Sequence, residues 1–409
     1  MLAPALSKFQ ETLTQIHQGG LHKQERLLIT PQGSTVTLNS QQAVLNFCAN
    51  NYLGLANHPQ IVAAAKAGLD QYGYGLSSVR FICGTHILHK TLEARVSQFL
   101  NTEETILYGS CFDANGGLFE VITDEDSLIL SDALNHASII DGIRLCKAQL
   151  YRYRHLDLAD LEQGLQQAHP AQLKIIATDG VFSMEGQIAP LADICTLAER
   201  YGAMVMVDDS HGTGVLGQRG AGTVEYCAVE GRVDIITSTF GKALGGASGG
   251  FTTGRRAIID LLRQRSRPYL FSNTLAPVIA AASLEAIAII EQTPSLRQTL
   301  LDNAQYFRRQ MVAQGFDIPA GIHPIVPIRV GEAPVAQTLS EALLQAGIYV
   351  TGFSYPVVPK GQALIRVQLS AAHTRPQIDQ CVAAFSDLAQ RHGNILPSPL
   401  APASTPAHP

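Results

Sequence analysis

Apolar runs and amphipathic stretches alternate through the middle of the chain, between about residues 105 and 255. Seven short runs have the pattern of buried strands: ETILYGS, DSLILSDA, QLYRYR, LKIIATDGVF, AMVMVDDS, VDIITST and GGFTTG. Between most of them lie stretches with helical periodicity, such as HASIIDGIRLCKA and LADICTLAERYG. Because each crossover between parallel strands returns over the sheet, this alternation predicts an α/β domain with a mostly parallel seven-stranded sheet sandwiched by helices.

The pattern changes after a long helical stretch at 256–312, which is broken at Pro268 and Pro277. Three strand-like runs (HPIVPIRV, IYVTGF and ALIRVQLS) and two helical ones (APVAQTLSEALLQAG and QIDQCVAAFSDLAQRHG) follow. They predict a smaller α+β domain at the C-terminal end. We expect four parts in chain order: an N-terminal arm (1–45), a large domain (46–290), a small domain (291–393) and a Pro/Ala/Ser-rich disordered tail (394–409).

Composition narrows the class of protein. With 409 residues, 46% hydrophobic and 15% charged, the chain is expected to be globular with a large core. A net charge of -5 without a run of like charges makes nucleic acid and anionic membranes poor partners. The seven cysteines form no CxxC pair, which predicts free thiols, a reducing compartment and no metal site. No secretory, transit or membrane-spanning pattern is recognisable, so we expect a soluble, cytoplasmic protein.

A single lysine, Lys242, lies between glycines in the apolar stretch STFGKALGG. A phosphate-binding Walker A loop is excluded, because Ile236 and Ala243 occupy positions where that loop needs Gly and Ser or Thr. Desolvation lowers the pKa of an amine in such a neighbourhood, and a neutral amine condenses with aldehydes. The stretch therefore predicts a nucleophilic lysine.

A second glycine motif suggests a different class of protein. Residues 212–217 read GxGxxG, the motif of NAD-dependent dehydrogenases. In that fold the first glycine directly follows a strand and a helix opens at once, whereas here DDSH intervenes and QRGAG follows. The dehydrogenase reading is therefore disfavoured.

If the aldehyde belongs to pyridoxal phosphate, three further groups are needed: a carboxylate at the ring nitrogen, a flat group over the ring, and donors to the phosphate. Asp208 and Asp209 end an apolar strand at the edge where ligands bind in α/β sheets, and His211 follows closely. His136 is placed to stack on a ring. The phosphate candidates are the backbone of Ser110, Cys111 and Phe112, at a helix start, and the hydroxyl of Thr239.

Each of these residues also has a structural reading. DDSH suits a turn that caps a helix, and His136 suits a helix cap or a core position. Arg366, a charge inside the apolar run ALIRVQLS, either pairs with a protein carboxylate or receives a substrate carboxylate. The residues alone leave these alternatives open.

Nine ordered motifs resemble those of the α-oxoamine synthases, which are fold-type I pyridoxal phosphate enzymes. They are NNYLGLANHP, SVRFICGTHILHK, SCFDANGG, SDALNHASIIDG, TDGVFSMEG, VDDSHGTG, STFGKALGG, RSRPYLFSN and YVTGFSYPVVPKGQALIRVQLSAAHT. The likeness covers about residues 20 to 393. Two positions depart from it: Gly212 stands where alanine is common, and Phe240 where a smaller or aliphatic residue is common, which puts the fine cofactor geometry in question.

The resemblance implies a role for each candidate. Lys242 holds the cofactor aldehyde, Asp208 faces the pyridine nitrogen and His136 stacks on the ring. The other implied cofactor residues are Cys111, Phe112, Ser183, Asp209, Ser210, His211, Thr239, Ser272 and Asn273. Of these, Ser272 and Asn273 reach the phosphate in a neighbouring subunit, which implies a homodimer. Asn51 and Arg366 match the positions that receive the glycine carboxylate.

The implied reaction is a reversible acyl transfer of threonine degradation. In it, 2-amino-3-oxobutanoate and CoA give glycine and acetyl-CoA. The nearest alternative within the family joins L-alanine to a long acyl-CoA. The size of the pocket, which separates the two, is not readable from the sequence.

Overall fold

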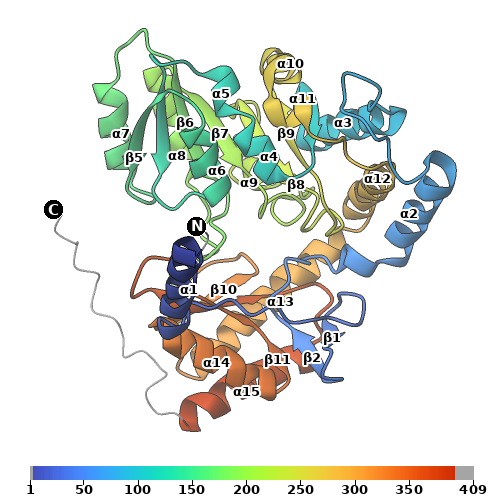
Figure 1. Cartoon of the computed structure of the whole chain (residues 1–409), viewed down its shortest axis with the longest axis vertical. Helices are drawn as coiled ribbons and strands as arrows, with labels where there is room; N and C mark the ends of the chain where they lie inside the picture. Colours follow the sequence, from blue (N-terminus) through green and yellow to red (C-terminus); the bar gives the residue numbers. More distant parts are fainter. Residues whose placement is uncertain (1–2, 392–409) are drawn as a thin grey trace. The chain divides into compact units, whose positions relative to one another are not determined.

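The computed structural model describes residues 3–391, so the predicted tail at 394–409 lies outside the described residues. The chain forms two compact units (Figure 1). The larger unit comprises Asn50–Ser183 and Gln187–Thr299. The smaller unit combines the residues before Asn50, the short segment Met184–Gly186 and the residues from Leu300 onward. The N-terminal segment thus belongs to the same unit as the C-terminal segment.

The larger unit is built on a seven-stranded sheet with the strand order β3-β9-β8-β7-β6-β4-β5. The strands are β3 (Glu104–Tyr108), β4 (Leu128–Asp132), β5 (Gln149–Tyr153), β6 (Lys174–Asp179), β7 (Met204–Asp208), β8 (Ile235–Thr239) and β9 (Gly250–Gly254). Six strands run in one direction, and β9 is antiparallel to both neighbours. The prediction of a mostly parallel seven-stranded sheet is confirmed.

Helices cover both faces of this sheet (Figure 1). The helices of the larger unit are η1 (Leu55–Asn57), α2 (Pro59–Tyr72), α3 (Ile87–Leu100), α4 (Cys111–Gly116), α5 (Phe119–Ile122), α6 (Ala137–Arg144), α7 (Leu158–Gln167), α8 (Leu191–Tyr201), α9 (Thr223–Tyr226), α10 (Arg256–Arg265), α11 (Arg267–Phe271) and α12 (Pro277–Gln292). Helix α13 (Pro294–Ala313) begins in the larger unit and ends in the smaller.

The core follows from the alternation of side chains along each strand. On β7, Val205 belongs to one hydrophobic cluster and the next residue, Met206, to another. The first cluster extends onto α7 and α8 through Leu161 and Ile194. The second extends onto α6 through Ile139 and includes residues of α4, α5, α10 and α11. Because both faces are covered, the strands read as continuous apolar runs in the sequence.

The smaller unit contains two three-stranded sheets, β1-β2-β11 and β10-β13-β12. Its elements are α1 (Ala3–Gln18), β1 (Thr35–Thr37), β2 (Ala43–Asn46), β10 (Ile325–Gly331), α14 (Ala333–Gln345), β11 (Ile348–Tyr349), β12 (Thr351–Phe353), β13 (Ala363–Gln368) and α15 (Arg375–Arg391). The prediction of one strand at IYVTGF is wrong. The run divides at Val350, because β11 pairs with β2 whereas β12 pairs with β13.

Candidate active site

Lys242 lies in the connection between the antiparallel strands β8 and β9. This loop closes on itself, since Phe240 and Gly249 are joined by a backbone hydrogen bond of 3.0 Å and Gly246 donates to Phe240 over the same distance. Gly246 has a φ of +78°, a conformation that favours glycine. The fully buried Phe240 packs on Phe251 of β9 and anchors the loop. The glycines around the lysine therefore shape the turn that presents it.

His211 contacts the lysine directly. Its Nε2 lies 2.8 Å from Lys242 Nζ, and its Nδ1 lies 2.8 Å from the hydroxyl of Tyr52. His211 belongs to the turns and bends that connect β7 with α9. In this described segment, no helix lies between the GxGxxG glycines and α9. A dinucleotide-binding motif needs a helix there, so the structure argues against the dehydrogenase reading. Tyr52 was not among the predicted site residues.

Asp208 is the last residue of β7, and its carboxylate is buried. Its Oδ1 accepts the backbone N–H of Ser210 at 3.0 Å. Its Oδ2 accepts Asn115 Nδ2 at 2.6 Å and lies 3.6 Å from Cys111 Sγ, which itself receives a bond from Ser210 Oγ at 3.3 Å. The predicted residues Cys111, Asp208 and Ser210 are thus brought together around one carboxylate.

Asn115 links Asp208 to His136. Besides Asp208, Asn115 Nδ2 donates to Ser138 Oγ at 2.8 Å, and Ser138 Oγ lies 2.7 Å from His136 Nδ1. On its other side, Asn115 Oδ1 accepts the hydroxyl of Thr237 at 2.8 Å. Every polar group of the Asn115 amide faces a side chain of this network, so the amide orients the carboxylate.

His136 caps the start of α6, where its Nδ1 accepts the Ser138 N–H. The structural reading of this residue therefore holds, and it does not exclude a ring-stacking role. Burial and the nearby charge of Lys242 lower the pKa of His136, while the charge of Asp208 opposes that shift. A lowered pKa keeps the imidazole neutral, and a neutral flat ring suits stacking.

Asp179 is a second buried carboxyl group beside Asp208, since the two residues pair in register on β6 and β7. It accepts the backbone N–H of His136 at 2.9 Å. Burial, followed by the charge of Asp208, raises the pKa of Asp179 well above its usual value. The proton that this favours on Asp179 lets two carboxyl groups share a buried region without mutual repulsion.

Asp209 points to a different set of partners. Its carboxylate accepts the hydroxyl of Thr223 at 2.5 Å and that of Thr213 at 3.0 Å. Burial raises its pKa to about 7, against the effect of these hydrogen bonds. A Cβ at Gly212 would lie 2.1 Å from Asp209 Oδ1. The glycine, which stands where alanine is common in the family, therefore leaves room for the carboxylate. Asp209 thus ties the β7–α9 connection together.

The predicted phosphate residues lie in three places. Cys111 and the half-exposed Phe112 begin α4. Thr239 ends β8, and its hydroxyl accepts Gly241 N–H at 3.0 Å within the lysine loop. Ser272 and Asn273 are exposed just after α11. The predicted ring contact Ser183 is half-buried beyond the end of β6.

The candidate carboxylate-binding residues are divided between the units. Asn51 is buried in the larger unit, where its Oδ1 accepts the Ala56 N–H at 3.2 Å. The adjacent Asn50 has a buried side-chain oxygen with no hydrogen-bond partner among residues 3–391, which makes it a further candidate for a ligand contact. Arg366 lies buried on β13 of the smaller unit, with its guanidinium 4.5 Å from the centroid of the Phe353 ring.

We expect Asn115→Ala to damage the site through Asp208. The change removes the 2.6 Å donor to Oδ2 and leaves the buried hydroxyl of Thr237 without its acceptor. Unpaired buried groups cost about 1–3 kcal/mol each, so the free energy of unfolding should fall by at least that amount. Urea denaturation measures this. The control is Gln163→Ala, a substitution at an exposed position. If Asn115→Ala lowered the free energy of unfolding by no more than this control, the proposed network would be contradicted.

Relatives of known type resemble this chain over most of its length. Residues 42–385 match the family described as aminotransferase class I and II. The chain is 56% identical over 378 residues to 2-amino-3-ketobutyrate coenzyme A ligase of Salmonella typhimurium, which covers 92% of this chain and 95% of the relative. It is 43% identical over 389 residues to 8-amino-7-oxononanoate synthase of Thermosipho melanesiensis, and this match covers 95% of this chain and 99% of the relative.

The fold has a close counterpart among solved structures. Serine palmitoyltransferase of S. paucimobilis, solved with a bound PLP–myriocin adduct, superposes with a TM-score of 0.90. The two sequences are 28% identical, and the match covers 95% of this chain and 99% of the other. Within the described range 3–391, none of the helices combines the length and the apolar character needed to cross a bilayer.

Proposed function

Because the chain belongs to the class I and II aminotransferase family, we propose that it is a pyridoxal-phosphate-dependent acyltransferase that converts 2-amino-3-oxobutanoate and CoA to glycine and acetyl-CoA, reversibly. The observation that carries this assignment is the 56% identity to 2-amino-3-ketobutyrate coenzyme A ligase over 92% of the chain. The resemblance to the α-oxoamine synthases that the motifs indicated is confirmed by these relatives.

The residues of the larger unit fit pyridoxal phosphate. The cofactor requires an amine, a carboxylate for the ring nitrogen, a flat stacking group and a donor to the phenolic oxygen. Lys242, Asp208, His136 and His211 supply these groups, and they are joined by hydrogen bonds or by electrostatic interactions within the same unit. Bound pyridoxal phosphate supplies an electron sink for the electron pair left on a substrate α-carbon.

Each of these side chains has a defined task in the proposed reaction. Lys242 holds the cofactor through its amine and, when released, moves the proton at the substrate α-carbon. Asp208, fixed by Asn115 and the Ser210 N–H, keeps a proton on the ring nitrogen. His136 orients the ring by stacking. Asn51 and Arg366 remain our candidates for the glycine carboxylate, and Cys111, Phe112, Thr239, Ser272 and Asn273 for the phosphate.

The choice of substrate is tested by comparing two pairs with the purified protein loaded with cofactor. Release of the CoA thiol is measured with glycine and acetyl-CoA, and then with L-alanine and a long acyl-CoA. We expect kcat/KM to be at least about tenfold higher for the first pair, a ratio that a pocket can achieve by size alone. A preference for the second pair would assign the activity of the 43% identical relative instead.

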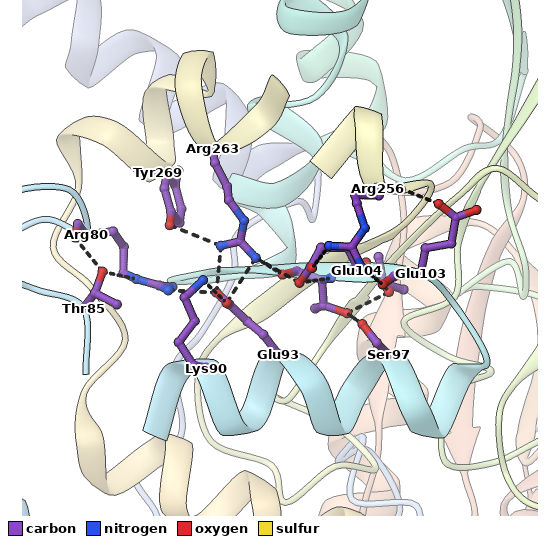
Figure 2. Close-up of polar contacts among 12 residues, drawn as sticks. Arg80, Thr85, Lys90, Glu93, Ser97, Glu103, Glu104, Arg256, Arg263 and Tyr269 are labelled. Carbon is purple, nitrogen blue, oxygen red and sulfur yellow. Dashed lines mark hydrogen bonds and ion pairs between the residues drawn. The ribbon is translucent and has the colours of Figure 1, made fainter. Parts of the chain in front are cut away.

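We also propose that the chain forms a homodimer, as the α-oxoamine resemblance implies. The supporting surface is a pocket of about 440 Å³ between α3 and α10–α11, rimmed by the exposed rings of Phe81 and Phe271. Two residues that line this pocket, Arg80 and Arg263, both bind Glu93 (Figure 2).

The dimer is tested by substituting Phe81, one of the two exposed rings at the rim of this pocket. Light scattering after size exclusion should give a mass of about twice 43.9 kDa for the wild type. Phe81→Asp places a charge at the proposed contact between protomers and should shift the protein toward monomer. The exposed Leu150→Asp is the control and should leave the mass unchanged. A monomeric wild type would refute the proposal.

A further inference from the structure

The hydroxyl of Tyr52 lies against His211 on the nitrogen opposite the lysine. Tyr52 is fully buried, and it reaches the site from a segment 159 residues away in the sequence. Its hydroxyl is 2.8 Å from His211 Nδ1, and His211 Nε2 is 2.8 Å from Lys242 Nζ. The tyrosine and histidine rings meet edge to face, with centroids 6.1 Å apart. The buried imidazole therefore bridges a phenol and an amine.

The chemistry of the three groups allows two arrangements. A lysine ammonium only donates, so it needs a lone pair on Nε2, and the imidazole proton then lies on Nδ1 and points at the tyrosine oxygen. A neutral amine accepts from Nε2–H, and Nδ1 then carries the lone pair that receives the tyrosine O–H. A hydroxyl both donates and accepts, so Tyr52 satisfies His211 in either tautomer.

We propose that Tyr52 is a positioning residue that holds the His211 ring with Nε2 toward Lys242 in both tautomers. This inference rests on the proposed function and adds a residue to it. The imidazole changes from acceptor to donor as the amine loses its proton, and Nδ1 keeps a partner throughout. Among the described residues, the titratable groups that interact electrostatically with Lys242 include His136, Asp179 and Cys111, whereas the group 2.8 Å from His211 Nδ1 is the Tyr52 hydroxyl.

Tyr52→Phe tests the proposal, because it removes the hydroxyl and keeps the ring. We expect the apoprotein to take up pyridoxal phosphate about tenfold more slowly, measured from the absorbance of the cofactor after rapid mixing. In the loaded enzyme, kcat with glycine and acetyl-CoA should fall about tenfold while KM for acetyl-CoA stays within about twofold. Unchanged uptake and kcat would overturn the proposal.

A double-mutant cycle separates positioning from packing. His211→Gln and the double variant Tyr52→Phe/His211→Gln complete the cycle. If Tyr52 acts through His211, the double variant should be no slower than His211→Gln alone, within about twofold. If the two losses multiply instead, Tyr52 acts independently of His211 and the proposal is wrong.

The matched control is Tyr153→Phe. Tyr153 ends β5 in the same unit, is also buried, and its hydroxyl has no hydrogen-bond partner within residues 3–391. Removal of this hydroxyl should leave the rate of pyridoxal phosphate uptake and kcat within about twofold of the wild type. An equal loss in both variants would show a general effect of removing buried hydroxyls and would overturn the proposal. A wild type that takes up no pyridoxal phosphate would refute the proposed function as well, so the two failures are distinguishable.

Discussion

Lys242→Ala is expected to abolish acetyl transfer, with kcat reduced by at least about 10⁴-fold. The loss is this large because one amine both holds the cofactor and moves the α-carbon proton, and the removal of a group with two roles is not compensated by its neighbours. The nearest side chain, His211, lies 2.8 Å from the lysine nitrogen, but an imidazole does not replace a primary amine in condensation with an aldehyde. Release of the CoA thiol from acetyl-CoA in the presence of glycine measures the effect.

The exposed lysine Lys147 provides a control for the loss of a positive charge. Lys147→Ala should retain the activity of the wild type. Thermal unfolding of Lys242→Ala should stay close to that of the wild type, because its side chain is only half-buried and the loop is held by backbone bonds and by Phe240. Residual activity above about a hundredth of the wild type would mean that another residue carries the chemistry.

Asp208→Asn is expected to lower kcat by at least about 100-fold with little change in the fold. Asparagine occupies nearly the same volume, but its single side-chain oxygen can accept from only one of the two donors, Asn115 Nδ2 or the Ser210 N–H. The negative charge that holds a proton on the ring nitrogen is also lost. The change in protonation should also shift the visible absorbance of the loaded protein. Steady-state kinetics and the absorbance spectrum measure the two effects.

The control for this variant is Asp193→Asn, an exposed carboxylate on α8. It should change neither kcat nor the spectrum. If Asp208→Asn retained more than about a tenth of the wild-type kcat, a different group would have to protonate the ring, and the buried Asp179 would become the leading candidate.

The sheet of the larger unit was predictable because it is buried on both faces. Strands such as β4, β6 and β7 then read as continuous apolar runs, and the residues after them fall at the ligand-binding edge. For this reason Asp208 and His211 could be proposed from the sequence. Lys242 could be proposed because a single lysine among glycines and apolar residues favours a chemical role for its amine.

The residues that support these groups were not predictable from pattern. Tyr52 lies in a segment without regular structure, and only the folded chain brings its hydroxyl to His211. Asn115 sits in a helix of six residues, too short to show a periodicity. A buried amide and a buried tyrosine read as ordinary core residues until their partners are known.

The smaller unit was harder to predict for a related reason. Strands β1 and β2 have three and four residues, and β11 has two, which is below the length at which alternation is visible. The division of IYVTGF between two sheets depends on pairing with β2 and β13, and β2 lies far away in the sequence. Local pattern carries no information about such long-range pairing.

The most direct test of the account is to find which residue carries the cofactor. The purified protein is loaded with pyridoxal phosphate, reduced with borohydride to fix the cofactor to the amine that holds it, and mapped by peptide mass spectrometry. We predict one modification per chain, on Lys242, and none in Lys242→Ala. Modification of a different lysine, or a protein that retains no cofactor, would contradict the assignment of the Lys242–His211–Asp208 arrangement as a pyridoxal phosphate site.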